Sequence, residues 1–252
     1  MDGWPYPLWI AHRGAGKLAP ENTLAAFQLG AQHGYRMFEC DAKLSADDVV
    51  FLMHDATLSR TTNSRKVFGR SLSNIGGEHA WSALSRLDAG GWHSRSSVDE
   101  PLATLQSLAH FCLANEYMLN IEIKPTPGME RRTGDVIARE AALLWAGAKL
   151  PPLLTSFRTE ALQAAQATRP ELPRGLLLST FWTGWLETAL SLACKAIVCN
   201  HAMWDRRTLA QARSAGFRCL AYTVNDKRAA QRLIDLGIDG IITDRIDLFP
   251  PA

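Results

Sequence analysis

The chain has 252 residues, which suits one large domain spanning residues 1–252, because barrels of alternating strands and helices reach this size undivided. Apolar residues make up 47% of it, and 27 Lys and Arg nearly balance 25 Asp and Glu. This balance argues against a nucleic-acid or membrane-surface binder, which would carry a basic excess. Any recognition of phosphate must therefore come from a few well-placed cations.

The cysteine count and the N-terminus indicate the compartment. Five cysteines are present, an odd number without a C-x-x-C pair, which predicts buried free thiols rather than disulfides or a thiolate zinc site. Residues 1–9 lack the basic start and apolar run of a signal peptide, and no stretch is apolar enough to span a bilayer. We therefore expect a cytoplasmic protein with no membrane partner.

Short apolar runs alternate with helix-like stretches along the whole chain. The predicted barrel strands cover residues 8–12, 37–42, 119–124, 153–157, 175–179, 196–200, 219–225 and 240–243. The predicted helices cover residues 21–33, 102–116, 134–148, 159–167, 185–193, 206–215 and 226–236. Strands that alternate with helices form βαβ units and a parallel sheet, so the pattern predicts an α/β fold, a (β/α)₈ TIM barrel.

One segment interrupts this rhythm. Residues 49–54 look like a strand but follow the second strand too closely for a parallel crossover, which needs a dozen or more residues. They predict an antiparallel hairpin that turns near Asp47 and Asp48. With residues up to 101, which are rich in Ser, Gly, Arg and Asn, they form an expected insertion of residues 44–101 after the second strand.

The insertion should form part of the wall over a substrate, because loops at the carboxyl end of a barrel carry specificity. Its scattered basic residues, Arg60, Arg65, Lys66 and Arg70, are for the most part expected to be solvated surface rather than ligand contacts.

Three carboxylates are predicted to converge inside the barrel. Glu39 and Asp41 are two apart on one strand and share a face, and Glu122 and Lys124 repeat this spacing on the next barrel strand. Buried charges need partners, and clustered carboxylate oxygens suit a hard divalent cation. The alternative is that the carboxylates are simply ion-paired with Lys124 and Arg13. The spacing leaves both interpretations open.

Two histidines are expected at the same rim. His12 and Arg13 end the first strand, and reactive groups lie at the carboxyl ends of barrel strands. In the predicted hairpin His54 falls roughly opposite Asp41, which brings a second histidine to the carboxylates. Histidines move protons near neutral pH, so His12 and His54 are candidate acid/base groups.

The first helix is preceded by polar residues whose roles are less distinct. Asn22 or Thr23 is expected to cap the helix, and Asn22 is expected, like Glu21, to support the site from outside rather than to act in catalysis. Glu21 is expected to orient Arg13 or His12 through hydrogen bonds from outside the immediate site.

Several motifs together resemble one family. They are His12-Arg13-Gly14, Pro20-Glu21-Asn22-Thr23, Glu39-x-Asp41, His54-Asp55, Glu122-x-Lys124, Tyr222-Thr223-Val224-Asn225 and Ile242-Thr243-Asp244. In this order and spacing the chain resembles the glycerophosphodiester phosphodiesterases over nearly its whole length. It is most similar to the cytoplasmic bacterial branch linked to glycerol-3-phosphate uptake.

The resemblance implies a (β/α)₈ barrel with a small insertion after the second strand. It also implies that Glu39, Asp41 and Glu122 hold one divalent metal ion, Mg²⁺ or Ca²⁺ with Mn²⁺ also suitable. His12 and His54 would be the acid/base pair, and Arg13 and Lys124 would hold the phosphate. The resemblance leaves open which histidine is which, and we assign His12 as the base and His54 as the acid.

The expected reaction is metal-dependent hydrolysis of small-molecule glycerophosphodiesters, such as glycerophosphocholine, glycerophosphoethanolamine and glycerophosphoglycerol, to sn-glycerol 3-phosphate and an alcohol. Alternatives are a related barrel phospholipase acting on intact lipids, a metal-dependent sugar isomerase or aldolase, and a non-catalytic phosphodiester-binding protein. The sequence is also compatible with a homodimer.

Overall fold

The computed structural model describes residues 4–69 and 72–251, which form a closed barrel. Its strands are β1 (Trp9–Ala11), β2 (Met37–Leu44), β3 (Val50–Leu52), β4 (Met118–Ile123), β5 (Leu153–Ser156), β6 (Arg174–Leu178), β7 (Ala196–Asn200), β8 (Arg218–Tyr222) and β9 (Gly240–Thr243). All strands except β3 pair in parallel, and the pairing of β1 with β2 closes the ring. The predicted (β/α)₈ barrel is confirmed.

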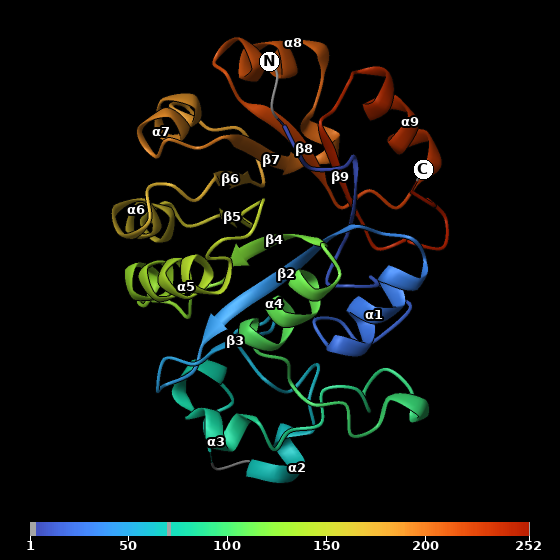
Figure 1. Ribbon diagram of the computed structural model, residues 1–252, viewed down its shortest axis with the longest axis vertical. Helices are drawn as coiled ribbons and strands as arrows, with labels where there is room; N and C mark the ends of the chain where they lie inside the picture. Colours follow the sequence, from blue (N-terminus) through green and yellow to red (C-terminus); the bar gives the residue numbers. More distant parts are fainter. Residues whose placement is uncertain (1–3, 70–71, 252) are drawn as a thin grey trace.

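Helices surround the barrel on its outer face (Figure 1). They are α1 (Leu24–Gln32), α4 (Leu105–Ala114), α5 (Glu130–Leu144), α6 (Thr159–Thr168), α7 (Trp185–Ser191), α8 (Arg206–Ser214) and α9 (Lys227–Asp235). The largest error in the predicted bounds concerns α5, which lies four residues earlier, while α1 and α4 each start three residues late because Thr23 and Thr104 cap them. Gly147, with a φ of 80°, lies beyond the end of α5, within the predicted helix.

The two faces of the barrel strands are buried in different surroundings. All residues of β2 are buried, and Phe38, Cys40, Ala42 and Leu44 pack into the layer between the sheet and the helices. The intervening Glu39, Asp41 and Lys43 therefore point into the barrel, as the period of two requires.

The barrel interior has an apolar floor below its polar mouth. The floor is formed by one cluster of buried side chains, Ile10, Met37, Leu153, Leu177, Ala196, Val198, Leu220 and Ile242. These residues exclude water from the lower barrel. The ionisable side chains of β2 and β4 are consequently confined to the carboxyl end, where a ligand can enter.

The hairpin is antiparallel as predicted, with Leu44 opposite Val50 and Asp48 at a φ of 64° in the turn. Its register differs slightly from the expectation. The backbone N–H of Met53 donates to the carbonyl of Asp41 at 2.9 Å, so His54 lies one residue beyond the predicted position opposite Asp41.

The segment between β3 and α4 contains the short helices α2 (Ser64–Phe68) and α3 (Trp81–Leu84) and lies beside the barrel in Figure 1. It has a small core of its own, formed by Phe51, Met53, Leu58, Leu84, Leu87, Ala89 and Leu102. Over residues 4–69 and 72–251, no helix is both long and apolar enough to cross a membrane.

Candidate active site

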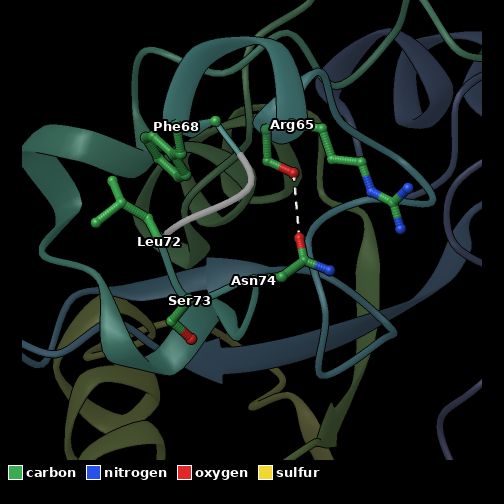
Figure 2. A pocket seen from close by; sticks show the side chains of 7 residues that line it. Arg65, Phe68, Leu72, Ser73 and Asn74 are labelled. Carbon is green, nitrogen blue, oxygen red and sulfur yellow. Dashed lines mark hydrogen bonds between the residues drawn. The ribbon is translucent and has the colours of Figure 1, made fainter.

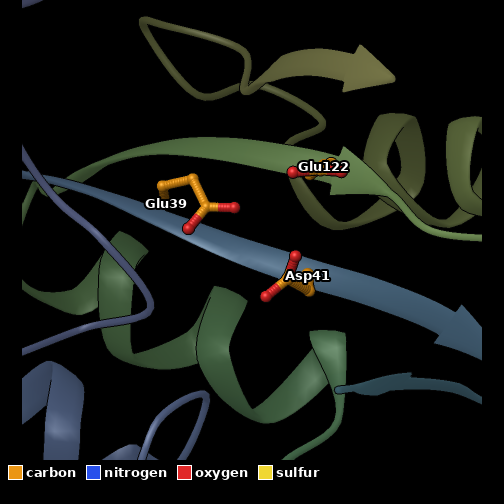
Figure 3. Close-up of side chains that lie close together, drawn as sticks. All are labelled: Glu39, Asp41 and Glu122. Atoms are coloured by element: carbon orange, nitrogen blue, oxygen red, sulfur yellow. The ribbon is translucent and has the colours of Figure 1, made fainter. Parts of the chain in front are cut away.

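The three predicted carboxylates meet at the carboxyl end of β2 and β4. Figure 3 shows Glu39 and Asp41 on β2 with Glu122 beside them on β4. One oxygen from each lies within 4.8 Å of the others, and the side chains are buried. Glu39 Oε1 and Asp41 Oδ1 have no hydrogen-bond partner among the described residues. Buried carboxylate oxygens without partners fit a hard cation, which would supply the missing ligand contacts.

The charges of this cluster are not balanced within it. Burial and the neighbouring Asp41 raise the pKa of Glu39 to about 8. Burial also opposes ionisation of Asp41, but Arg13 and Lys124 outweigh it and hold the pKa of that carboxyl well below its usual range. The protein alone therefore stabilises the anion of Asp41 but not that of Glu39 near neutral pH, and a bound cation would stabilise both.

Two cations flank the carboxylates. Arg13 Nε lies 3.0 Å from Asp41 Oδ2, and Lys124 Nζ lies 2.9 Å from Glu122 Oε1 and 3.7 Å from Asp41 Oδ1. The ion pairs that the sequence offered as an alternative to metal ligation are thus present. Among the described residues they include no Arg or Lys side chain on Glu39, whose Oε2 accepts from the backbone N–H of Arg13 at 3.1 Å and lies 3.7 Å from Nε2 of His12.

Each histidine is backed by an aspartate. Nδ1 of His12 lies 2.6 Å from Oδ1 of Asp244, and Nδ1 of His54 lies 2.7 Å from Oδ1 of Asp55. A carboxylate only accepts, so each Nδ1 donates, and Nε2 is the nitrogen left for a substrate. Nε2 of His12 lies 3.7 Å from Oε2 of Glu39.

The pKa values of the histidines shift in opposite directions. Burial disfavours the charged form of His12, but Glu39 and the hydrogen bond to Asp244 outweigh it and raise its pKa. Burial, with Arg13 and Lys124 nearby, lowers the pKa of His54 despite the attraction of Asp41.

Asn22 contacts a carboxylate of the cluster instead of capping the first helix. Thr23, not Asn22, accepts from Ala26 N and caps α1. Asn22 is buried with a φ of 62°, its Nδ2 donates to Asp41 Oδ2 at 2.9 Å, and its Oδ1 accepts from Asp41 N at 3.1 Å. It therefore fixes Asp41 at both its backbone and its side chain. Glu21 accepts from Arg13 Nη1 at 2.9 Å, so its expected contact with Arg13 is present.

Arg60 is exposed and does not line the pocket, but it has partners that the sequence did not indicate. The guanidinium group contacts both carboxylate oxygens of Glu21 and both of Asp55. It is not free solvated surface but touches the partners of Arg13 and His54. Arg70, grouped with it in the sequence, lies outside the described residues.

These side chains surround a pocket of about 160 Å³ at the barrel mouth. It is lined by His12, Arg13, Glu39, His54, Asn120, Glu122, Lys124, Phe157, Leu177, Tyr222, Thr223 and Ile242. Of the described insertion residues only His54 is among them, so the insertion contributes less wall than expected. A wider hollow of about 480 Å³ between Arg65 and Asn74, shown in Figure 2, shares no lining residue with this pocket.

A (β/α)₈ barrel with acidic, basic and imidazole groups converging in a pocket at the carboxyl ends of its strands has the architecture of a barrel enzyme. Comparison with protein-family models agrees with this class and identifies the family within it. The model described as the glycerophosphoryl diester phosphodiesterase family matches residues 12–248, so the chain belongs to that family. It is a glycerophosphodiester phosphodiesterase, as the resemblance predicted.

Several named proteins are similar to this chain over most of its length. YhdW of Bacillus subtilis is 28% identical over 245 residues, covering 94% of each protein. The glycerophosphodiester phosphodiesterase of Caldanaerobacter subterraneus is 27% identical over 241 residues, covering 94% of this chain and 93% of the relative. An Oleispira antarctica phosphodiesterase, whose structure holds the product sn-glycerol-3-phosphate, is 32% identical with a TM-score of 0.84, covering 94% of this chain and 93% of the other.

Proposed function

We propose that this protein uses one divalent cation to hydrolyse glycerophosphodiesters, among them glycerophosphocholine, glycerophosphoethanolamine and glycerophosphoglycerol, to sn-glycerol 3-phosphate and an alcohol. The observation that carries the proposal is a cluster of three carboxylates beside one small pocket that two of them line together with two cations and two histidines. The product bound to the Oleispira antarctica relative supports the choice of substrate class.

Glu39, Asp41 and Glu122 would hold the cation, because their oxygens are buried, mutually close and incompletely hydrogen-bonded. Oxygen ligands suit Mg²⁺ or Ca²⁺, and Mn²⁺ also fits. When bound, the cation supplies positive charge that stabilises the negative charge developing on the phosphoryl oxygens. Asn22 keeps Asp41 in the orientation that this role requires.

Arg13 and Lys124 would bind the phosphodiester from two sides. Both line the pocket, and both are anchored by carboxylates that leave further N–H donors available. A guanidinium can meet two phosphate oxygens at once, whereas an ammonium acts as a point charge. Together they would neutralise the single charge of the substrate and orient the phosphorus for attack.

His12 and His54 would transfer the protons. We assign His12 as the base, which takes a proton from the attacking water or glycerol 2-hydroxyl, and His54 as the acid, which gives one to the departing alcohol oxygen. Attack by the 2-hydroxyl would form a cyclic phosphate, which water would open in a second step to give sn-glycerol 3-phosphate. Glu39 contributes to the raised pKa of His12, and a cation on Glu39 would offset that contribution and favour the neutral base. Asp244 and Asp55 would keep each Nε2 directed at the substrate.

Incubation with glycerophosphocholine and Mg²⁺ tests the function directly. We expect equal amounts of sn-glycerol 3-phosphate and choline, both followed by coupled enzymatic assays. A preparation of the His12→Ala/His54→Ala double variant, purified in the same way, should form neither, which excludes a contaminating enzyme. Release of glycerol and phosphocholine instead, or hydrolysis of intact phospholipid alone, would contradict the proposal.

We also expect broad tolerance of the alcohol half. Phe157 and Tyr222 form an aromatic side of the pocket, with ring centroids 5.8 Å apart, and the Tyr222 hydroxyl donates to Leu178 O. Within residues 4–69 and 72–251, the carboxylates that line the pocket belong to the cation cluster. Among these residues, no further carboxylate lines the pocket that could bind the ammonium group of choline or ethanolamine.

Glycerophosphocholine, glycerophosphoethanolamine and glycerophosphoglycerol should therefore have kcat/KM values within about tenfold of one another. A preference above ~10³-fold would correspond to about 4 kcal/mol and would require a dedicated head-group site. Steady-state kinetics on the three substrates at one cation concentration provide the measurement.

A further inference from the structure

Arg60 stands between the two sides of the site, on the segment that follows β3. Its Nε and Nη2 donate to the two oxygens of Asp55 at 2.6 and 3.0 Å. Its Nη1 and Nη2 donate to the two oxygens of Glu21 at 2.8 and 2.7 Å. One planar group thus holds two carboxylates, each through paired hydrogen bonds, which is the strong geometry for this pair of groups.

These two carboxylates are the anchors of two proposed functional groups. Asp55 accepts from Nδ1 of His54 at 2.7 Å, and Glu21 accepts from Nη1 of Arg13 at 2.9 Å. The result is one continuous series of contacts, His54–Asp55–Arg60–Glu21–Arg13, which we call the rim network. It connects a group that would move a proton to one that would bind the phosphate.

The donors of Arg60 are largely committed to this network. A guanidinium has five N–H donors, and four are used on Asp55 and Glu21. Arg60 also does not line the pocket. A direct contact with the phosphodiester would therefore require breaking existing hydrogen bonds, and the geometry favours an indirect role.

The segment that carries Arg60 is itself fixed. The side chain of Thr62 donates to the carbonyl of Leu58 at 2.7 Å, and both residues are buried. Asn63 N donates to Asp88 O at 3.1 Å. Contacts on both sides thus hold the backbone around Arg60. The guanidinium group therefore extends from a fixed position and can hold Asp55 and Glu21 in place.

We propose that Arg60 is a positioning residue that holds His54 and Arg13 in one productive arrangement through Asp55 and Glu21. The proposal rests on the proposed function, which gives those two groups their roles. Isolated surface ion pairs contribute little, but Arg60 serves two carboxylates whose side chains are only 26% and 12% exposed. Without Arg60, Asp55 and Glu21 would lose the group that fixes them, and the orientation that they give to His54 and Arg13 would be less restricted.

The test compares Arg60→Gln and Arg60→Lys with a matched control. Arg132 forms a similar fork with Asp48 and is comparably exposed, at 51% against 43% for Arg60, but this partner is neither Asp55 nor Glu21 and so is outside the rim network. We expect Arg60→Gln to lower kcat/KM about 10- to 100-fold, the usual range for residues that orient a functional group. Arg60→Lys, which cannot span both carboxylates, should recover little of the loss, and Arg132→Gln should change kcat/KM less than twofold.

A double-mutant comparison separates positioning from folding. In an Asp55→Asn/Glu21→Gln background both routes from Arg60 are removed, so adding Arg60→Gln should change kcat/KM by less than about threefold. Thermal melts on every variant confirm that the compared proteins are folded. An equal loss in both backgrounds, or normal kinetics for Arg60→Gln, would overturn the proposal.

Failure of the Arg60 proposal and failure of the proposed function give different results in these variants. If His54→Ala retains normal turnover, the acid role of His54 is wrong whatever Arg60 does. If His54→Ala is inactive while Arg60→Gln is fully active, the function stands and the rim network is not needed for it.

Discussion

Removal of divalent cations is expected to abolish hydrolysis of glycerophosphocholine, and Mg²⁺ or a similar hard cation is expected to restore it. The reason is the cluster of Glu39, Asp41 and Glu122, whose buried oxygens lie within 4.8 Å of one another. Chelation followed by exhaustive dialysis, then titration with Mg²⁺, Ca²⁺ and Mn²⁺, provides the measurement. Undiminished turnover in chelator would show that the cluster functions only through its ion pairs.

Binding of the cation should also be visible without an activity assay. A ligand that binds only the folded state stabilises it, by about 2.7 kcal/mol at a concentration a hundred times its Kd. Mg²⁺ should therefore raise the Tm of the native protein but not that of Glu39→Gln. As a control, Glu116→Gln removes a carboxylate that is 85% exposed, and it should keep the full shift. Equal shifts in all three proteins would indicate nonspecific binding.

Replacement of either histidine by alanine is expected to lower kcat by at least ~10²-fold, the usual scale for a general acid or base. His12 and His54 both line the pocket and lie at strand ends rather than in the core, so their variants should fold. Steady-state kinetics and thermal melts together make the measurement. His110→Ala, which removes an exposed imidazole from α4, should have native kinetics.

Asp244 and Asp55, which accept from Nδ1 of His12 and His54, allow a second prediction about the histidines. Asp244→Asn keeps the size of the group but allows an amide N–H to face Nδ1 of His12, which favours the wrong tautomer. Turnover should fall by about 10- to 100-fold while the Tm is nearly unchanged. If His12→Ala or His54→Ala turns over at the native rate, that histidine is structural, and the corresponding aspartate variant should then be active as well.

The barrel and its carboxylate cluster were predictable because they depend on local periodicity. Glu39 and Asp41 are two apart on one strand, and Glu122 recurs on the next barrel strand, so alternation alone directs them inward. The hairpin was predictable from chain length, since the few residues between β2 and β3 cannot make a parallel crossover. The placement of His54 then followed, although one residue out of register.

The partners of these groups depend on contacts that no local pattern encodes. Pairing of Ala11 with Thr243 joins β1 to β9 and thereby sets Asp244 beside His12, 232 positions away in the sequence. Asn22 reaches Asp41 only because its backbone takes a positive φ before α1. Arg60 looked like solvated surface until the fold brought Glu21 to it from 39 residues away. The sequence by itself determined which residues point into the barrel, through periodicity, whereas barrel closure and loop packing decided which charges meet, because hydrogen bonds depend on distances in space rather than along the chain.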